Sequence, residues 1–195
     1  MSPIKEADLD LRVRRTRRML TQAFVDLLSE KNFQSITVQD ITSRAMVNRA
    51  TFYDHFVDKY ALLQYSINEW FQETLNNRLH ESSGWNAQNL QQLVLTTCEF
   101  LFQLHHHCQP IDHQMLMLAQ STITDGLTQI LESWARESDI SITPDPSSVG
   151  LVATVTSWSI FGAASFWVGQ DRKEPVEAYV DRVMPVLFAN LSQSV

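Results

Sequence analysis

The stretch from residue 36 to residue 59 holds side chains whose types and spacing suit contact with a nucleic acid. An arginine such as Arg49 can pair with two acceptors on a guanine edge, and a small side chain such as Ala50 can meet a thymine methyl group. Hydroxyl groups can reach phosphate oxygens. The residues expected to face outward here are Arg49, Ala50, Thr51, Tyr53 and His55. We therefore expect this stretch to contact double-stranded DNA.

Two short helices and a tight turn are predicted to position these side chains. Thr37, followed three residues later by Asp40, has the spacing of a capping box and predicts a helix over residues 38–45. Asn48 is a good N-cap for a third helix over about residues 49–56, and Asp58 can cap a fourth helix that starts at Lys59. The proportions are those of a helix-turn-helix. The alternative is a helical hairpin with a solvated, arginine-rich face.

A family resemblance rests on these same residues. Val38, Asp40, Ile41 and Ala45, then residues 49–56 and 58–59, resemble the DNA-binding domain of the TetR/AcrR family of transcriptional regulators over about residues 12–65. The resemblance implies a homodimer on a palindromic operator, with base contact by Arg49 and Ala50. It implies phosphate contact by Thr37, Thr51, Tyr53, His55 and Lys59.

One position departs from the family pattern. The family commonly has glycine in the turn where this chain has Met46. If that position is left-handed, a residue other than glycine costs about 1–2 kcal/mol. The departure questions the geometry of the turn and leaves the assignment in place.

The charge is unevenly divided along the 195 residues. The net charge is −7, yet residues 1–60 contain 10 basic and 8 acidic residues and carry +2, while the rest contains 5 and 14 and carries −9. Such asymmetry is typical of proteins that contact nucleic acid. Four arginines on or ahead of the first helix can reach phosphates or the minor groove: Arg14, Arg15, Arg17 and Arg18.

Helical periodicity dominates, and no alternating strand pattern persists. We predict an all-α fold of about nine helices, with separate helices over residues 113–118 and 121–137. Residues 1–58 are expected to form the helix-turn-helix domain, and residues 59–195 a ligand-binding and dimerisation domain. The two cysteines and the lack of a signal-peptide pattern predict a cytoplasmic protein.

One segment, residues 149–169, is long and apolar enough to cross a bilayer. It contains five serine and threonine residues and lacks a basic flank on its N-terminal side. A helix buried in protein on most of its faces explains it better, so no membrane partner is expected.

Aromatic and methionine side chains of the second part can build an apolar cavity for a small molecule. The candidates for ligand contact are Trp70, Phe71, Phe100, Met115, Trp134, Trp158 and Phe161. Ordinary core packing is the alternative for each. The charge of −9 and the few basic residues predict a hydrophobic ligand that is neutral or cationic, and no cofactor is expected.

The last two predicted helices suit dimerisation. Residues 174–191 have an apolar arc too wide for one contact, and residues 162–165 are small enough for close backbone approach. The interface candidates are Ala163, Phe166, Val180, Val183 and Leu187. The alternative places both faces in the core of one chain.

Histidines at residues 105–107, with Cys108 and His113, have residue types that suit Zn²⁺. Consecutive helical residues diverge by about 100°, so no metal site is expected. No nucleophile elbow, zinc-protease motif or phosphate loop is present, so no enzyme is expected. We predict a ligand-released transcriptional repressor. The alternatives are a small-molecule-binding or scaffolding helical dimer without a role on DNA, and a hydrolase or metalloenzyme.

Overall fold

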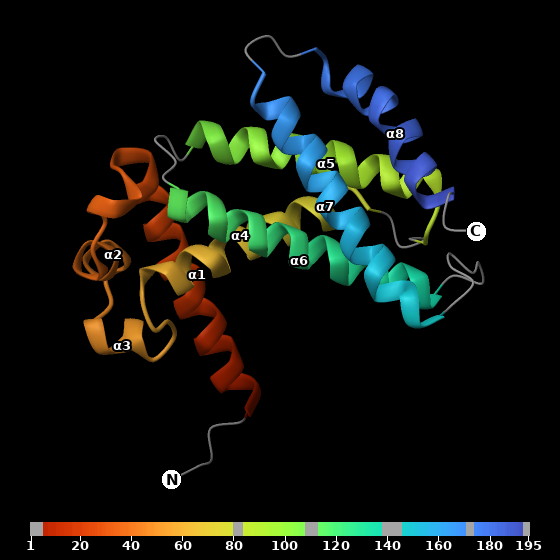
Figure 1. The fold of residues 1–195 in the computed structure, drawn as a ribbon. Helices are drawn as coiled ribbons and strands as arrows, with labels where there is room; N and C mark the ends of the chain where they lie inside the picture. Colours follow the sequence, from red (N-terminus) through yellow and green to blue (C-terminus); the bar gives the residue numbers. More distant parts are fainter. Residues whose placement is uncertain (1–5, 80–83, 108–112, 138–145, 171–173, 193–195) are drawn as a thin grey trace. The chain divides into compact units, whose positions relative to one another are not determined.

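The computed structural model describes residues 6–79, 84–107, 113–137, 146–170 and 174–192. Within these ranges the chain forms eight α-helices and no strand, which confirms the all-α prediction (Figure 1). They are α1 (Glu6–Glu30), α2 (Val38–Ala45), α3 (Arg49–Tyr53), α4 (Lys59–Asn76), α5 (Ala87–His107), α6 (His113–Glu137), α7 (Val149–Val168) and α8 (Val176–Ser192), with 3-10 turns η1 (Phe33–Ser35) and η2 (Pro146–Ser148).

Two predicted helix boundaries differ from the structure. The separate helices expected over residues 113–118 and 121–137 are one helix, α6, because no glycine or proline separates them. Helix α3 ends at Tyr53, three residues earlier than expected, and Asp54 is its C-cap.

The chain divides into two compact units. The amino-terminal unit consists of residues 1–66 and 106–116, and the carboxy-terminal unit of residues 67–105 and 117–195. Helix α4 contributes residues 59–66 to the first unit and 67–76 to the second. The functional division expected between residues 58 and 59 stays a prediction.

In the amino-terminal unit, α1 packs against α2, which in turn contacts α3. The core is apolar: Phe24 of α1, Ile41 of α2 and Phe52 of α3 are fully buried. The rings of Phe24 and Phe33 meet edge to face at 6.0 Å, which closes the core beneath η1. The two short helices are thereby held on the long helix α1.

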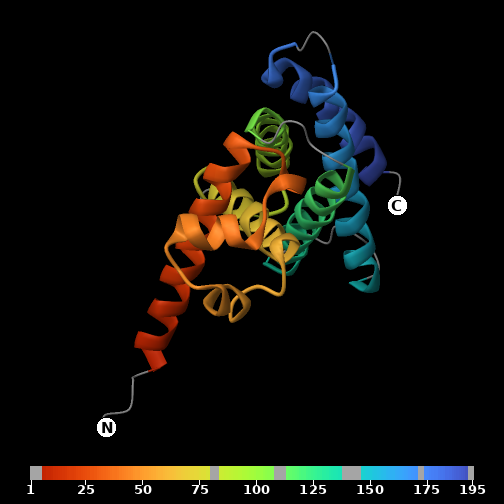
Figure 2. The same cartoon turned by 90° about the vertical axis from the view of Figure 1, so that its left-hand side faces the viewer.

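In the carboxy-terminal unit, α7 and α8 lie side by side in both views (Figures 1 and 2). The Tyr179 hydroxyl donates to the carbonyl of Ala163 at 2.7 Å, and the Trp167 indole donates to the carbonyl of Glu174 at 3.1 Å. Thr128 donates to Ser157 at 2.8 Å and so joins α6 to α7. These buried polar groups fix how α7 packs within the unit.

Helix α7 is the one described helix that is long and apolar enough to cross a membrane. Only 33% of its most apolar stretch of 18 residues is buried inside the single chain. The expectation that protein covers most of its faces is therefore wrong for the single chain. A helix that packs along one side leaves the other side open. The exposed residues, spaced by three and four, define what we name the α7 stripe: Leu151, Val155, Trp158, Gly162 and Phe166.

Candidate nucleic-acid interface

The three predicted helix caps are confirmed. The Thr37 hydroxyl accepts from the Asp40 N–H at 3.1 Å while Asp40 accepts from the Thr37 N–H at 2.8 Å, which is a complete capping box. The side-chain oxygen Oδ1 of Asn48 accepts from the Thr51 N–H at 2.7 Å at the start of α3. Asp58 accepts from two N–H groups of the first turn of α4. Three helix starts are therefore fixed by local bonds.

Met46 occupies the left-handed conformation, with φ 54° and ψ 40°, a point that the sequence left open. Its side chain is 86% exposed, so no packing contact offsets the backbone cost of about 1–2 kcal/mol. The turn is nevertheless closed by the Val47 N–H, which donates to the carbonyl of Thr42 at 3.0 Å. The chain keeps the geometry of the helix-turn-helix without the usual glycine.

Helix α3 presents one exposed face, which we name the α3 face: Arg49, Ala50, Tyr53 and Asp54. Phe52 points into the core on the opposite side. Thr51 and His55, also predicted to face outward, are half-buried. Asp54 was not among the predicted contacts, although it follows Ala50 by four residues and so shares its face.

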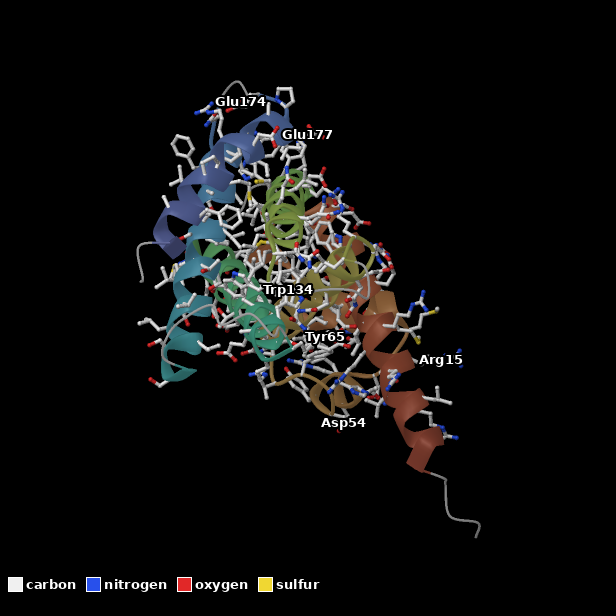
Figure 3. The ribbon with its side chains drawn as sticks, turned by 90° about the vertical axis from the view of Figure 1, so that its right-hand side faces the viewer. Arg15, Asp54, Tyr65, Trp134, Glu174 and Glu177 are labelled. Atoms are coloured by element: carbon white, nitrogen blue, oxygen red, sulfur yellow. The ribbon has the colours of Figure 1, made fainter. Side chains whose placement is uncertain are left out.

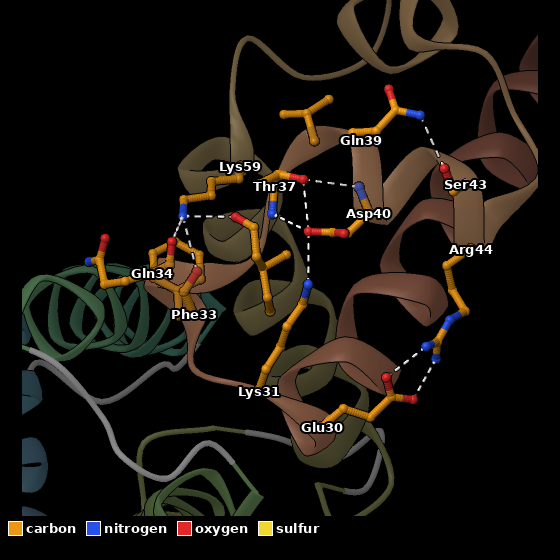
Figure 4. A network of polar contacts seen from close by, with 12 residues as sticks. Glu30, Lys31, Phe33, Gln34, Thr37, Gln39, Asp40, Ser43, Arg44 and Lys59 are labelled. Atoms are coloured by element: carbon orange, nitrogen blue, oxygen red, sulfur yellow. Dashed lines mark hydrogen bonds and ion pairs between the residues drawn. The ribbon is translucent and has the colours of Figure 1, made fainter.

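Lys59 has a role that the sequence did not reveal. Its ammonium donates to the carbonyls of Phe33, Gln34 and Ile36 at 3.0, 3.0 and 2.9 Å (Figure 4). It also lies 4.6 Å from the centroid of the Phe33 ring. An ammonium has three donors, and all three are engaged. A phosphate contact by Lys59 would have to displace at least one of these bonds, so we leave Lys59 out of the DNA contacts proposed below.

Two ion pairs fasten the end of α1 to α2 (Figure 4). Arg44 binds both carboxylate oxygens of Glu30, at 2.8 and 2.7 Å, and Lys31 pairs with Asp40 at 2.8 Å. The hydrogen bond from Lys31 and then those from Thr37 hold the pKa of Asp40 well below its usual range. The hydrogen bond from Arg44 lowers the pKa of Glu30. Sequence reasoning missed both pairs because they join residues outside a single helix.

The remaining basic side chains of this unit lie mainly on α1. Arg12, Arg15 and Arg18 are exposed, and among the described side chains none of the three has an acidic partner. Figure 3 shows Arg15 on the side of α1 away from Tyr65. Arg17 is half-buried instead, with its guanidinium 5.4 Å from the centroid of the Tyr65 ring. Positive charge available to DNA therefore lies on α1 and at Arg49.

The structure brings together three of the seven predicted ligand residues. The ring of Phe100 lies 4.7 Å from that of Trp70 and 5.0 Å from that of Phe71, centroid to centroid. Trp134 of α6 and Phe161 of α7 are also buried. Met115 is buried but belongs to the amino-terminal unit, and Trp158 is half-exposed on the α7 stripe.

A groove of about 350 Å³ runs between α7 and α8. It is lined by Ser159, Ala163, Phe166, Tyr179, Arg182, Val183, Val186 and Leu187. Four of the five predicted interface residues are in this set. Val180 is fully buried and belongs to the core of its own unit, so it is removed from the predicted interface. Leu151 and Val155 of the α7 stripe are also exposed and were not among the predicted interface residues, although their helical spacing is visible in the sequence.

The described residues contain no group of three metal-ligating side chains, and Cys108 of the histidine-rich segment lies outside them.

Two short capped helices, a tight turn and an arginine-bearing exposed face define a helix-turn-helix DNA-binding domain. Residues 20–65 match the model of the family described as bacterial regulatory proteins, tetR family. The amino-terminal part of the chain is therefore similar to the DNA-binding domain of this family.

Sequence relatives match part of the chain. An HTH-type transcriptional regulator of Bacillus subtilis, YxbF, is 44% identical over 80 residues, which are 40% of this chain and 21% of YxbF. The dhaKLM operon transcriptional activator DhaS of Lactococcus lactis is 31% identical over 75 residues, 38% of this chain and 40% of DhaS. The chain thus matches less than half the length of either relative.

Solved structures share the fold over the chain's length. The regulator FadR of Bacillus subtilis in complex with stearoyl-CoA has a TM-score of 0.53 at 16% identity, covering 87% of this chain and 96% of FadR. NalD of Pseudomonas aeruginosa, a secondary repressor of a multidrug efflux pump, has a TM-score of 0.55 at 18% identity, covering 91% and 96%. Identities this low show the fold alone.

Proposed function

We propose that this protein is a homodimeric, ligand-responsive transcriptional repressor that binds a palindromic operator. The observation that carries the proposal is the exposed α3 face with Arg49, held on helices whose starts are fixed by caps. Relatives with a similar domain are named as transcriptional regulators. In this account the protein acts in the cytoplasm by binding, without catalysis.

The proposed DNA contacts follow from exposure and position. Arg49 and Ala50 read base edges, because they lie exposed on α3. Thr51 and His55, half-buried at the edge of that face, contact phosphate, and Thr37 places a phosphate at the positive end of α2. The exposed arginines of α1 supply the sequence-independent part of the affinity.

The proposed dimer forms through the α7 stripe and the groove beside it. Leu151, Phe166 and Val186 are 63–67% exposed, which is unusual for apolar side chains that cluster on one surface. An added Cβ at Gly162 would have no atom within 4 Å, so a partner helix can approach there closely. When a second copy covers this surface, α7 and α8 of the two copies form a four-helix bundle around a two-fold axis. The dimer then presents two α3 helices to half-sites about 34 Å apart.

The proposed ligand contacts the cluster of Trp70, Phe71 and Phe100. Each described arginine of the carboxy-terminal unit is paired with a glutamate: Arg78 with Glu99, Arg136 with Glu132, and Arg182 with Glu174. A polyanion would have to displace one of these carboxylates. A hydrophobic ligand that is neutral or cationic fits this charge pattern better.

Helix α4 connects the two activities in this account. It carries Trp70 and Phe71 of the proposed ligand site, and at its other end Lys59 bonds to the loop ahead of α2. A ligand that favours a dimer with a different separation of the α3 helices lowers DNA affinity by its differential affinity for that state.

The test is selection of duplexes from a random DNA library by the purified full chain. We expect enrichment of a palindrome with half-sites one helical turn apart, and release by neutral or cationic hydrophobic compounds but not by stearoyl-CoA. Recovery of unenriched DNA, with no salt dependence of binding, would instead favour the scaffolding or small-molecule-binding alternative.

A further inference from the structure

The side chains of Arg49 and Tyr53 form a pair on the exposed α3 face. We propose that Tyr53 is a positioning residue that orients the Arg49 guanidinium for base reading, in place of the phosphate contact that the family resemblance implies. The inference rests on the proposed DNA-binding function and assigns one determinant of its sequence specificity.

The geometry of the pair is direct. Arg49 Nη2 donates to the Tyr53 hydroxyl at 3.3 Å, and the guanidinium carbon lies 5.8 Å from the centroid of the Tyr53 ring. Positions four residues apart on a helix are neighbours, so the helix itself brings the two side chains together. The hydroxyl and the ring each hold the guanidinium, by a hydrogen bond and by a cation–π contact.

Tyr53 is itself anchored to the protein core. Its ring meets the ring of Phe52 edge to face at 5.4 Å, and Phe52 is fully buried. Arg49 has no such anchor of its own, since it is exposed on α3. A contact chain therefore runs from the core through Phe52 and Tyr53 to the arginine.

This arrangement suits base reading because an arginine has five N–H donors in a plane. Tyr53 accepts from one of them, which leaves enough donors for a two-bond contact with a guanine edge. A long side chain loses rotamer entropy when a base fixes it. Tyr53 imposes part of that loss before DNA arrives, which raises affinity for the correct base.

The two roles of Tyr53 predict different effects of its removal. A phosphate contact by the uncharged Tyr53 hydroxyl contributes to binding of every sequence. A positioning role contributes only to the preference for the selected sequence, and only while Arg49 is present. A double-mutant cycle separates them, because it measures whether one residue acts through the other.

The experiment measures binding of Tyr53→Phe, Tyr53→Leu, Arg49→Ala and the Arg49→Ala/Tyr53→Leu double variant. The probes are a duplex enriched by the wild-type chain from a random library and a scrambled duplex of equal length. We expect Tyr53→Leu to weaken binding to the enriched duplex by about three- to tenfold and to leave scrambled binding and the salt slope unchanged. Tyr53→Phe, which keeps the ring, loses less, and Tyr53→Leu adds no loss in the Arg49→Ala background.

The control variant is Val57→Ala, an exposed change outside the α3 face, which is expected to keep full discrimination. Thermal unfolding monitors the fold, and Tyr53→Phe carries the test if Tyr53→Leu unfolds. Equal weakening on both duplexes, or multiplying losses in the double variant, overturns the positioning role. A wild-type chain with no preference between the duplexes overturns the proposed function itself, and this inference with it.

Discussion

The two units of this protein differ in how they use polar groups and in what they expose. In the amino-terminal unit, charged groups fix local geometry: Asp40 closes a capping box and Lys59 binds three carbonyls. In the carboxy-terminal unit, buried hydroxyls such as those of Thr97 and Thr122 donate to carbonyls of their own helices. The exposed surface of α7 is apolar. Caps and charged groups fix the geometry of the first unit, and the second exposes an apolar surface on α7.

The largest expected effect is on the apolar surface of the carboxy-terminal unit. Phe166→Glu places a carboxylate in the proposed interface, where burying an unpaired charge costs several kcal/mol. We expect dimer dissociation to increase by about a thousandfold and operator binding to be lost with it. Sedimentation equilibrium measures the dissociation constant.

The matched control is Gln129→Glu, which adds the same charge at an exposed position of α6. Gly162→Leu is a second test of the proposed interface. The single chain has room for the added side chain, whereas a partner helix packed closely against Gly162 would leave no room for it. A Phe166→Glu chain that remains fully dimeric would contradict the proposed interface.

The next effect separates Lys59 from a phosphate contact. Lys59→Met removes three charge-assisted hydrogen bonds, so we expect a loss of about 2 kcal/mol of unfolding free energy and an unchanged salt slope of DNA binding. The opposite pattern is expected of Arg15→Gln on α1, which lowers the slope by about 0.9 without changing stability. Chemical denaturation and salt-titrated binding measure the two quantities. If Lys59→Met kept normal stability and reduced the salt slope of DNA binding, a phosphate contact by Lys59 would be supported.

A smaller effect is expected at the turn of the helix-turn-helix. Met46→Gly removes the left-handed strain without removing a packing contact, and we expect a gain of about 1 kcal/mol in unfolding free energy. Val57→Gly, an exposed change without positive φ, should give no gain. Urea denaturation with an unchanged m-value checks both, and a destabilised Met46→Gly would mean that the side chain contributes in a way the structure does not show.

The smallest effect concerns acid stability. The pKa values of Asp40 and Glu30 are lowered in the folded chain, so their stabilisation is complete above the unfolded values near pH 4 and is lost as pH falls through the lowered values. Because both pairs are solvent-exposed, the loss is expected to be modest. The melting temperatures of Asp40→Asn and Glu30→Gln should depend less on pH between pH 7 and pH 3 than that of the wild type. Equal slopes of melting temperature against pH would contradict a role of the two carboxylates in acid stability.

The amino-terminal unit was predictable to the extent that its contacts are local. Thr37 with Asp40, Asn48 and Asp58 act within three residues, whereas the sequence left open whether Met46 is left-handed. The bonds of Lys59 span 23 to 26 residues and left no pattern in the sequence. Residue spacing predicts which side chain caps a helix, but it does not predict which distant carbonyls a lysine binds.

The carboxy-terminal unit was predictable only in its class. Apolar residues on α7 indicate burial, yet the sequence does not say whether the same chain or a second one covers them. Val180 and Val183 lie three residues apart on α8, and only packing decides that the first is fully buried while the second lines the groove. Trp158 was expected to contact the ligand. It lies on the exposed α7 stripe instead, because its exposure also depends on packing.

The measurement that tests the central claim most directly compares wild type and Arg49→Ala on an enriched and a scrambled duplex across a salt series. The account predicts that Arg49→Ala loses about ten- to a hundredfold in affinity for the enriched duplex. It also predicts that the variant keeps most of its binding to the scrambled duplex. Full discrimination by Arg49→Ala would contradict the claim that the α3 face reads the operator.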